Sequence, residues 1–269
     1  QQSSYGLDCL EYGFRMYDPT VARWWAVDPL AEKRYWLSPY LYVQNNPIVK
    51  IDPDGRLDDI VITGPETINA YFELQKSTKN QIILSIDENG KISYNENSGF
   101  IGPMSEDVNL LKEIIDNHSI VVNLEATSEL YTSKGEIFIG GAFLGNEFPS
   151  VDCITDVVVN AYQAVDPIFT SKMDTYYNKP GAGVLHEVTE AYSGAKNARN
   201  SGTPYGNANK NNKEYLKAHN QATPQSGDIF ETYFDKYNNA VTPGSPNAVK
   251  VEYSVKDFEK APAVIKIIK

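Results

Sequence analysis

The residues best suited to chemistry lie in GAGVLHEVTEAYSGAKNA, residues 181–198, which contains one of the three histidines of the chain. On a helix, at about 100° per residue, its valines and most of its alanines fall on one apolar side. His186 and Glu190 then lie about 40° apart on the opposite side, and Glu187 lies between that pair and the apolar side. An imidazole and a carboxylate one helical turn apart can bind the same cation, so we expect a metal site on this helix.

This spacing resembles the active-site helix of the zincins, zinc metallopeptidases whose motif is H-E-x-x-H. The chain has H-E-x-x-E, because Glu190 stands at the position of the second histidine, and a carboxylate is also an accepted zinc ligand. The resemblance implies that zinc is bound by His186 and Glu190, with Glu187 as the general base that takes a proton from water. A third ligand must come from elsewhere, and His219 is the natural candidate.

Several nearby residues are alternatives for supporting roles. Asp228 and Glu231 become candidate ligands if the site holds more carboxylates. The hydroxyl of Tyr192 or of Tyr215 is expected to stabilise an oxyanion, and the sequence does not select between them. His118 ends the helix predicted at residues 105–118, where a cation suits the helix dipole, so capping is expected there and not metal binding. A histidine and two carboxylates on the polar side of a helix also occur in soluble proteins that bind no metal.

The elements that position these residues are expected to mix helices and strands. Residues 85–99 predict a hairpin around an Asn-Gly turn, and residues 105–118 predict an amphipathic helix that begins at a serine. The segment GGAFLGN, 140–146, predicts a strand that ends in a turn where backbones approach closely. The polar residues 197–215 predict a loop. No regular βαβ period is visible, which favours an α+β fold. The β-rich runs are 119–126, 135–145, 156–165, 231–237 and 249–255.

Residues 1–55 have a different texture, because they contain all three tryptophans and several Asp-Pro and Asn-Pro pairs typical of turns. Short strands are expected there, in a segment too short to bury its aromatic side chains alone. Its motifs YGFRMYDP, RW, DPLA, SPY, NNP and DPDG occur in the order found at the C-terminal end of the Rhs repeat-associated core domain, in its Bacteroidetes form. In that family the core plugs a hollow shell of β repeats, and a variable toxin follows DPxG. The resemblance therefore implies a boundary after Gly55 and an effector domain at residues 56–269.

Self-cleavage beyond this boundary is a further implication of the resemblance. In that family two aspartates act as an aspartic-protease-like pair, since two close carboxylates share one proton. Asp28 and Asp52 are the matching residues, and the scissile bond is expected near residues 55–58. The chain departs from the pattern at Ala31, where the family has glycine, and by a longer spacer. The alternative is that Asp-Pro only shapes turns here.

The composition narrows the classes of partner. The formal net charge is -11, with Lys+Arg 24 against Asp+Glu 35, and an acidic surface argues against nucleic acid as a partner. No apolar run is long enough to span a membrane, and the first residues do not form a signal peptide. The chain lacks an initiator Met, so we expect a C-terminal piece of a longer polypeptide. Cys9 and Cys153 are expected to be free thiols, not a disulfide or a zinc-thiolate site.

The second half of the chain, with GGAFLGN and the H-E-x-x-E block, resembles a metallopeptidase type of toxin found after Rhs cores. The resemblance implies a zinc-dependent peptidase that a contractile or other secretion apparatus delivers into a competing cell. Its partners would be the Rhs shell of the same polypeptide, a cognate immunity protein and a protein or peptide substrate. Two alternatives remain open: a metal-dependent nuclease toxin, and a cargo that binds without catalysis.

Overall fold

The computed structural model describes residues 10–11, 15–27, 38–42, 60–117, 119–148, 158–207, 213–257 and 259–269. The chain divides into two compact units. The first is Gln1–Asp58 with Val151–Cys153, and the second is Asp59–Ser150 with Ile154–Lys269. Five residues with predicted roles lie outside the described residues, and the expectations about them stay predictions: Cys9, Asp28, Asp52, His118 and Cys153.

The first unit contains a small antiparallel sheet in the order β1-β2-β3. Its strands are β1 (Leu10–Glu11), β2 (Met16–Asp18) and β3 (Arg23–Trp24). Trp24 is buried against Tyr17 and Tyr42, with ring centroids 5.8 and 5.1 Å away, in edge-to-face arrangements. Arg15 places its guanidinium carbon 4.2 Å from the centroid of the Trp24 ring. The described part of this unit thus has the short strands that its sequence predicts. The sequence does not predict that Trp24 is buried by side chains of the same unit.

The second unit combines ten strands and five helices among its described residues. The strands are β4 (Ile60–Thr63), β5 (Ile82–Ile86), β6 (Ile92–Glu96), β7 (Ile120–Ala126), β8 (Gly141–Glu147), β9 (Val159–Val165), β10 (Phe230–Phe234), β11 (Ala240–Val241), β12 (Lys250–Val255) and β13 (Ala263–Ile268). The helices are α1 (Thr67–Ser77), α2 (Glu106–Ile115), α3 (Pro167–Tyr177), α4 (Ala182–Ser201) and α5 (Lys213–Gln221). This mixture confirms the predicted α+β class.

The central sheet has the order β4-β7-β9-β8. Strands β4, β7 and β9 are parallel, whereas β8 runs antiparallel to β9 and forms one edge. Along β7 buried and half-buried residues alternate, which is the pattern of a strand with one covered face. The buried side chains of β7 and β9 join those of α1, α2 and α4 in one apolar core. The sheet therefore presents its apolar face to the helices.

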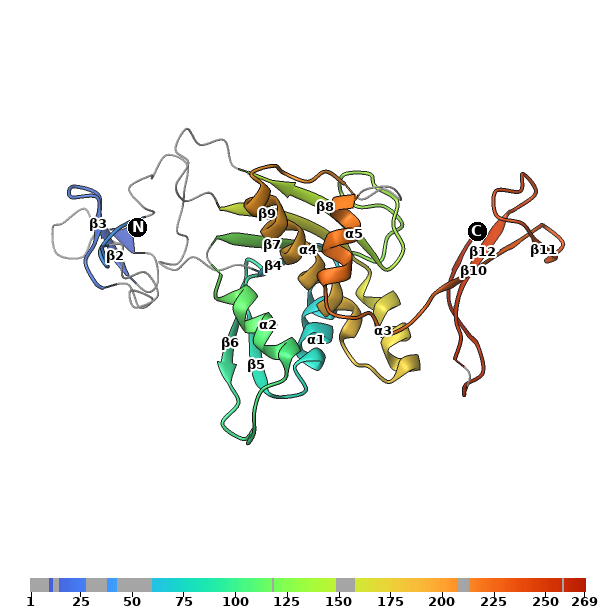
Figure 1. Ribbon diagram of the computed structural model, residues 1–269, viewed down its shortest axis with the longest axis horizontal. Helices are drawn as coiled ribbons and strands as arrows, with labels where there is room; N and C mark the ends of the chain where they lie inside the picture. Colours follow the sequence, from blue (N-terminus) through green and yellow to red (C-terminus); the bar gives the residue numbers. More distant parts are fainter. Residues whose placement is uncertain are drawn as a thin grey trace. The chain divides into compact units, whose positions relative to one another are not determined.

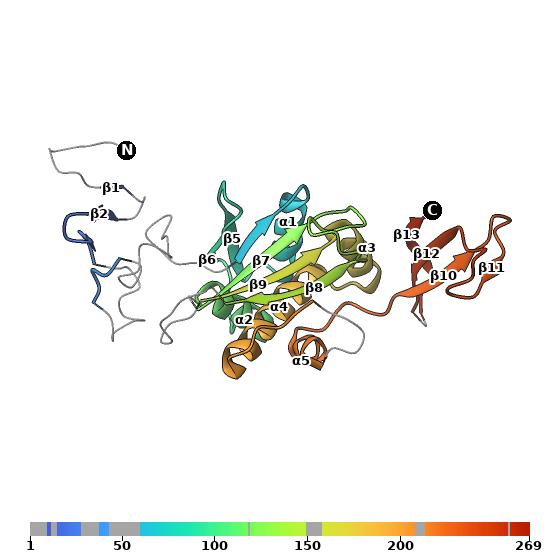
Figure 2. The same cartoon turned by 90° about the horizontal axis from the view of Figure 1, so that it is seen from above.

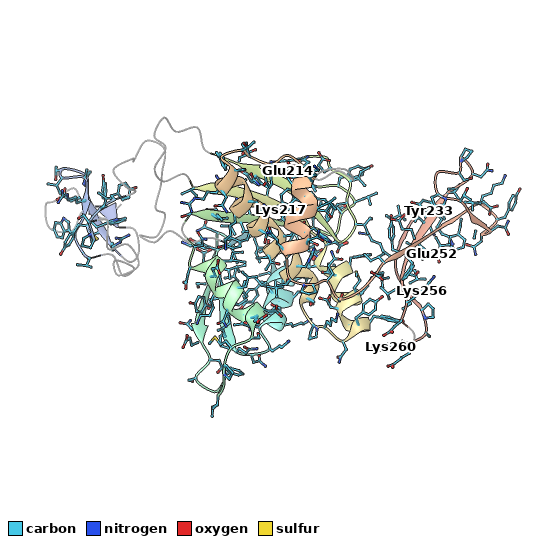
Figure 3. The ribbon with its side chains drawn as sticks, in the orientation of Figure 1. Glu214, Lys217, Tyr233, Glu252, Lys256 and Lys260 are labelled. Atoms are coloured by element: carbon cyan, nitrogen blue, oxygen red, sulfur yellow. The ribbon has the colours of Figure 1, made fainter. Side chains whose placement is uncertain are left out.

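Helix α4 is the element that links the sheet to the rest of the unit. It contacts β7, β8 and β9 on one side and α5 on another, so it lies between the sheet and α5 (Figures 1 and 2). Helix α5 presents Glu214 and Lys217 to solvent, as Figure 3 shows, while its Ala218 is buried. The buried side of α5 is thus the side that faces α4.

A second antiparallel sheet, in the order β11-β10-β12-β13, is formed by the end of the chain. Tyr253, Val255 and Ile265 from this sheet pack against Phe169 and Met173 of α3. Tyr233 and Glu252 in Figure 3 belong to β10 and β12 of the same sheet. Among the described residues, no helix combines the length and the apolar character that crossing a bilayer requires.

Several element predictions are confirmed, and others are wrong. The hairpin is β5–β6, and α2 begins after Ser105, whose hydroxyl accepts a hydrogen bond from the Val108 amide. The predicted loop at 197–215 is wrong at both ends, because α4 continues to Ser201 and α5 begins at Lys213. Tertiary contacts override local composition there: Ala198 is buried, and Asn197 Nδ2 donates to Gln221 Oε1 at 2.6 Å. The strand predicted for GGAFLGN is confirmed, since residues 141–146 belong to β8, but the turn at its end is wrong, because β8 continues to Glu147.

Candidate metal centre

The polar side of α4 is buried, unlike that of an ordinary surface helix. His186, Glu187 and Glu190 have relative exposures of only 2%, 5% and 3%. The cause is the position of α4, which is covered by β8 and β9 on one side and by α5 on the other. The sequence predicts one core face and one displayed face, and this expectation is wrong. Ionisable groups are buried in this way only when they are paired or bind an ion.

His186, Glu190 and His219 come together as the sequence predicts. His186 Nε2 lies 3.2 Å from His219 Nδ1 and 3.5 Å from Glu190 Oε2, and His219 Nδ1 lies 2.6 Å from Glu190 Oε2. These three residues form the group that could hold a metal ion among the described residues. Ligands about 2.0–2.2 Å from a tetrahedral zinc ion are separated by about 3.3 Å, so two of the three distances already suit that geometry. The third distance, between His219 Nδ1 and Glu190 Oε2, is that of a hydrogen bond, which a bound ion would replace.

A second layer of hydrogen bonds fixes the ring of His186. Its Nδ1 lies 2.5 Å from the backbone oxygen of Thr223, in the segment that follows α5. An Nδ1–H that donates to this carbonyl leaves the Nε2 lone pair directed at the site. Thr189, one turn along α4, accepts from the Thr223 amide at 3.0 Å and also contacts the Thr223 hydroxyl at 3.1 Å. Helix α4 therefore holds the carbonyl that orients its own histidine.

Glu187 lies beside the triad and shares a partner with Glu190. Gln163 of β9 donates its amide to Glu187 Oε2, and the same nitrogen lies 2.9 Å from Glu190 Oε1. Burial raises the pKa of Glu187 well above its usual range, and the charge of Glu190 raises it further. Burial also raises the pKa of Glu190, but hydrogen bonds with His186 and His219 outweigh this and the net shift is downward. The two carboxylates thus differ in the state that they favour: Glu187 favours holding a proton, and Glu190 favours its negative charge.

The histidines respond to the same carboxylates. Burial lowers the pKa of His186, but its hydrogen bond to Glu190 and the charge of Glu187 outweigh this effect, so the pKa is raised. A cation is therefore favoured between these groups, either as a proton on His186 or as a metal ion.

Gly141 at the start of β8 allows the close approach of Glu187 to the sheet edge. A Cβ atom at this position would lie 2.0 Å from the Glu187 carboxyl carbon. The glycine-rich segment therefore has a structural role that its sequence indicates, the close approach of another group to the backbone.

A cavity of about 530 Å³ opens beside these groups. Glu187, Glu190 and His219 line it, together with Tyr215 and residues of β8. Burial, with the charges of Glu190 and Glu187, raises the pKa of Tyr215 to about 12, so its hydroxyl keeps its proton. Tyr192 lies elsewhere, because its hydroxyl contacts Glu113 and Asn117 near α2. Of the two tyrosines, Tyr215 is thus the one that lines the cavity.

Two alternative ligands do not join the group, and two supporting residues were not foreseen. Asp228 and Glu231 are exposed and lie outside the triad. The sequence did not indicate Gln163 or Thr223. A single glutamine in an apolar strand and a threonine in a loop belong to no spaced motif. The burial of the carboxylates on α4 requires a hydrogen-bond donor such as Gln163, but that burial is not visible in the sequence.

The chain matches no known protein family and no solved structure. A stretch of 46 residues is 41% identical to part of Salivary gland surface protein 1 of Aedes aegypti. The match covers 17% of this chain and 1% of that protein. This likeness is too short to assign the chain to a family.

Proposed function

We propose that residues 56–269 form a zinc-dependent peptidase. The observation that carries this proposal is the convergence of His186, Glu190 and His219 beside a cavity that Glu187 also lines. Two imidazole nitrogens and one carboxylate form a donor set that suits zinc and leaves a position open for a substrate. The buried second-layer contact of His186 with Thr223 also fits a metal site.

A zinc ion held by these three residues would supply Lewis-acid chemistry, by polarising a peptide carbonyl and acidifying water. The remaining work belongs to side chains of the chain. The Glu187 carboxylate accepts a proton from the attacking water and returns it to the leaving amine, and its raised pKa suits this exchange near neutral pH. The Tyr215 hydroxyl keeps its proton and is placed along the cavity wall to stabilise the oxyanion.

The edge strand β8 supports a peptide as the substrate. It ends the order of the central sheet, and its residues 141–143 line the cavity beside Glu187. An extended peptide can add to such an edge through main-chain hydrogen bonds. Among the described residues that line the cavity there is no lysine or arginine, which argues against the phosphate backbone that a nuclease must bind.

The setting of this enzyme is part of the same proposal. The first unit is the end of an Rhs-type core, and the second is the toxin that follows it. The proposal is supported by the spaced motifs of residues 5–55 and by the division of the chain into units at Asp58 and Asp59. We further propose delivery into a competing cell by a bacterial secretion system, and protection of the producing cell by an immunity protein.

Cleavage of a peptide library by the full chain tests the enzymatic proposal. Loaded with one equivalent of zinc, the protein is expected to generate new amino termini, detected by mass spectrometry. Glu187→Gln is expected to lower the rate by about 100-fold or more, because it removes the general base but keeps the shape of the side chain. The same variant is expected to bind zinc normally, since Glu187 is not a ligand.

Glu147→Gln is the matched control, because it makes the same change at an exposed carboxylate of β8. It is expected to cleave like the wild type. Cleavage by Glu187→Gln at the wild-type rate would count against the proposal. So would the absence of zinc-dependent cleavage by both the wild type and Glu147→Gln.

A further inference from the structure

The cavity continues past the triad toward the N-terminus of α4. Gly183, Glu187 and Glu190 all line it, and the first two are one helical turn apart on the same side of α4. From the Gly183 end to the Glu187 end, the helix rises by about 6 Å. The lining of the cavity thus extends from Glu187 and Glu190 to the N-terminal end of α4.

A buried carboxylate lies at this far end. Asp174 of α3 is 1% exposed, lines the cavity and accepts hydrogen bonds from the Gly183 amide at 3.0 and 3.2 Å. It substitutes for the missing cap of α4, because residue Gly181 has no side chain that could cap the helix. Capping accounts for one contact, but Asp174 forms no ion pair with any residue that the structure describes.

Burial raises the pKa of Asp174, and the Gly183 amide offsets part of this effect. A ligand cation in the cavity would remove the remaining cost of the charge.

A neighbouring hydroxyl, that of Ser226, forms no well-formed hydrogen bond with the described residues of the chain. Ser226 lines the same end of the cavity, is 3% exposed and leaves its hydroxyl without a hydrogen bond of acceptable geometry. The nearby hydroxyl contributes to lowering the pKa of Asp174, so the two groups are close together. A buried hydroxyl without a well-formed hydrogen bond, beside a carboxylate without a counter-ion, indicates a place for a donor from a ligand.

The lining of the cavity also contains apolar side chains. They include Ile139, Phe169, Met173 and Ile229, and Phe169 and Met173 belong to the packed core between α3 and the C-terminal sheet. A cavity with apolar side chains in its lining and a buried carboxylate at one end suits a side chain with an aliphatic stem and a cationic head. Lysine and arginine are the amino acids of that kind.

We propose that this end of the cavity is a specificity site that accepts the lysine or arginine side chain of a substrate residue next to the cleaved bond, with Asp174 and Ser226 as its partners. This inference rests on the proposed peptidase function. The formal net charge of -11 also favours the approach of basic substrates.

Binding of two matched probes to the zinc-loaded full chain tests the site without catalysis. N-acetyl-arginine methylamide carries the cation, and N-acetyl-citrulline methylamide has nearly the same shape without it. Calorimetry is expected to show about tenfold tighter binding of the arginine probe, because one charge-assisted hydrogen-bond pair is worth about one factor of ten.

Asp174→Asn is expected to remove this preference, because the amide keeps an acceptor for Gly183 but has no charge. Asp228→Asn is the matched control, since it removes one charge from an exposed residue that does not line the cavity. It is expected to keep the preference. Circular dichroism checks that Asp174→Asn is folded. If it is not, Ser226→Lys, which supplies a tethered cation beside Asp174, is expected to remove the preference instead. Equal affinities of the wild type for both probes, or a preference that survives in the folded variant, would overturn the proposal.

Cleavage of peptides with arginine or citrulline next to the cleaved bond separates this inference from the proposed function. A probe preference without any cleavage would leave the cation site standing and remove the peptidase. Cleavage that depends on Glu187 but occurs equally with arginine and citrulline would support the peptidase and remove the cation site.

Discussion

His186 Nε2 and His219 Nδ1 lie 3.2 Å apart, although 33 positions separate the two residues in the chain. Two imidazoles at this distance cannot both carry a proton at low cost. Glu190 lies within 3.5 Å of both nitrogens and supplies the negative charge that a shared cation needs. The arrangement is therefore suited to one divalent ion. The affinity for that ion depends on how α4 and α5 are held together.

His219→Ala is expected to lower zinc affinity by about 100-fold or more, since losing a ligand costs at least as much as losing a second-layer partner. Elemental analysis after dialysis against a weak chelator measures this change. His118→Ala removes the remaining imidazole of the chain and is expected to keep one equivalent of zinc. Equal zinc content in His219→Ala and His118→Ala would show that a group other than His219 is the third ligand.

Thr189→Val tests the second layer of hydrogen bonds. Without the Thr189 hydroxyl, the Thr223 amide loses its acceptor and the carbonyl that orients His186 is less well fixed. Zinc affinity is expected to fall by about 10- to 100-fold while the fold is kept. Thr175→Val is the matched control, because its hydroxyl bonds Ser171 on α3, outside the site. Competition with a fluorescent chelator gives the affinities, and similar values for the two variants would contradict the proposed role.

The sequence predicts which three side chains converge better than it predicts their surroundings. Spacing on α4 indicated His186 and Glu190, and the scarcity of histidine indicated His219. The sequence did not predict that α4 is covered on both sides, because the polar side of this helix has the composition of a surface helix. Burial there depends on β8, β9 and α5, which lie outside the helical segment itself, and the pattern within α4 cannot show such contacts.

The fold shows the same division between local and distant information. The hairpin β5–β6 and helix α2 follow from local turn and capping signals, so their sequences predict them. The parallel pairing of β4, β7 and β9 was not predicted, since the connection from β4 to β7 contains a hairpin as well as two helices. Asn-rich and Gly-rich composition also hid the end of α4, which packing keeps helical to Ser201.

The stability of the metal-free protein is expected to depend on pH through Glu187. Its folded pKa is raised above the ordinary value of 4.5, so ionisation above that pH destabilises the folded state until the raised pKa is passed. The raised pKa of His186 acts in the same direction above its ordinary value of 6.5, because a favourable protonated state is lost. The free energy of unfolding in urea with chelator present should therefore fall from pH 4.5 upward.

Glu187→Gln is expected to flatten this fall, most clearly between pH 4.5 and 6.5, where His186 contributes little. The expected difference at neutral pH is on the order of 1 kcal/mol or more, as for a shift of one pKa unit. The effect of Glu190 lies below pH 4.5, since its pKa is lowered. Parallel curves for the two proteins would show that Glu187 titrates normally.

Gly141→Ala is expected to destabilise the protein by about 1–3 kcal/mol, as overpacking in a core does. The added methyl group would lie 2.0 Å from the Glu187 carboxyl carbon, so either the strand or the carboxylate must move. Gly206→Ala is the matched control, because a Cβ there meets nothing within 4 Å. Thermal unfolding measures both variants, and equal midpoints would mean that Gly141 is not needed for the close approach.

The most direct test of the metal centre is an anomalous difference map from a crystal of the zinc-loaded protein, collected at the zinc edge. We expect a single strong peak about 2.0–2.2 Å from His186 Nε2, His219 Nδ1 and a carboxylate oxygen of Glu190. A map with no peak between these three residues, or with zinc bound only elsewhere, would contradict the metal centre and the peptidase function proposed for it.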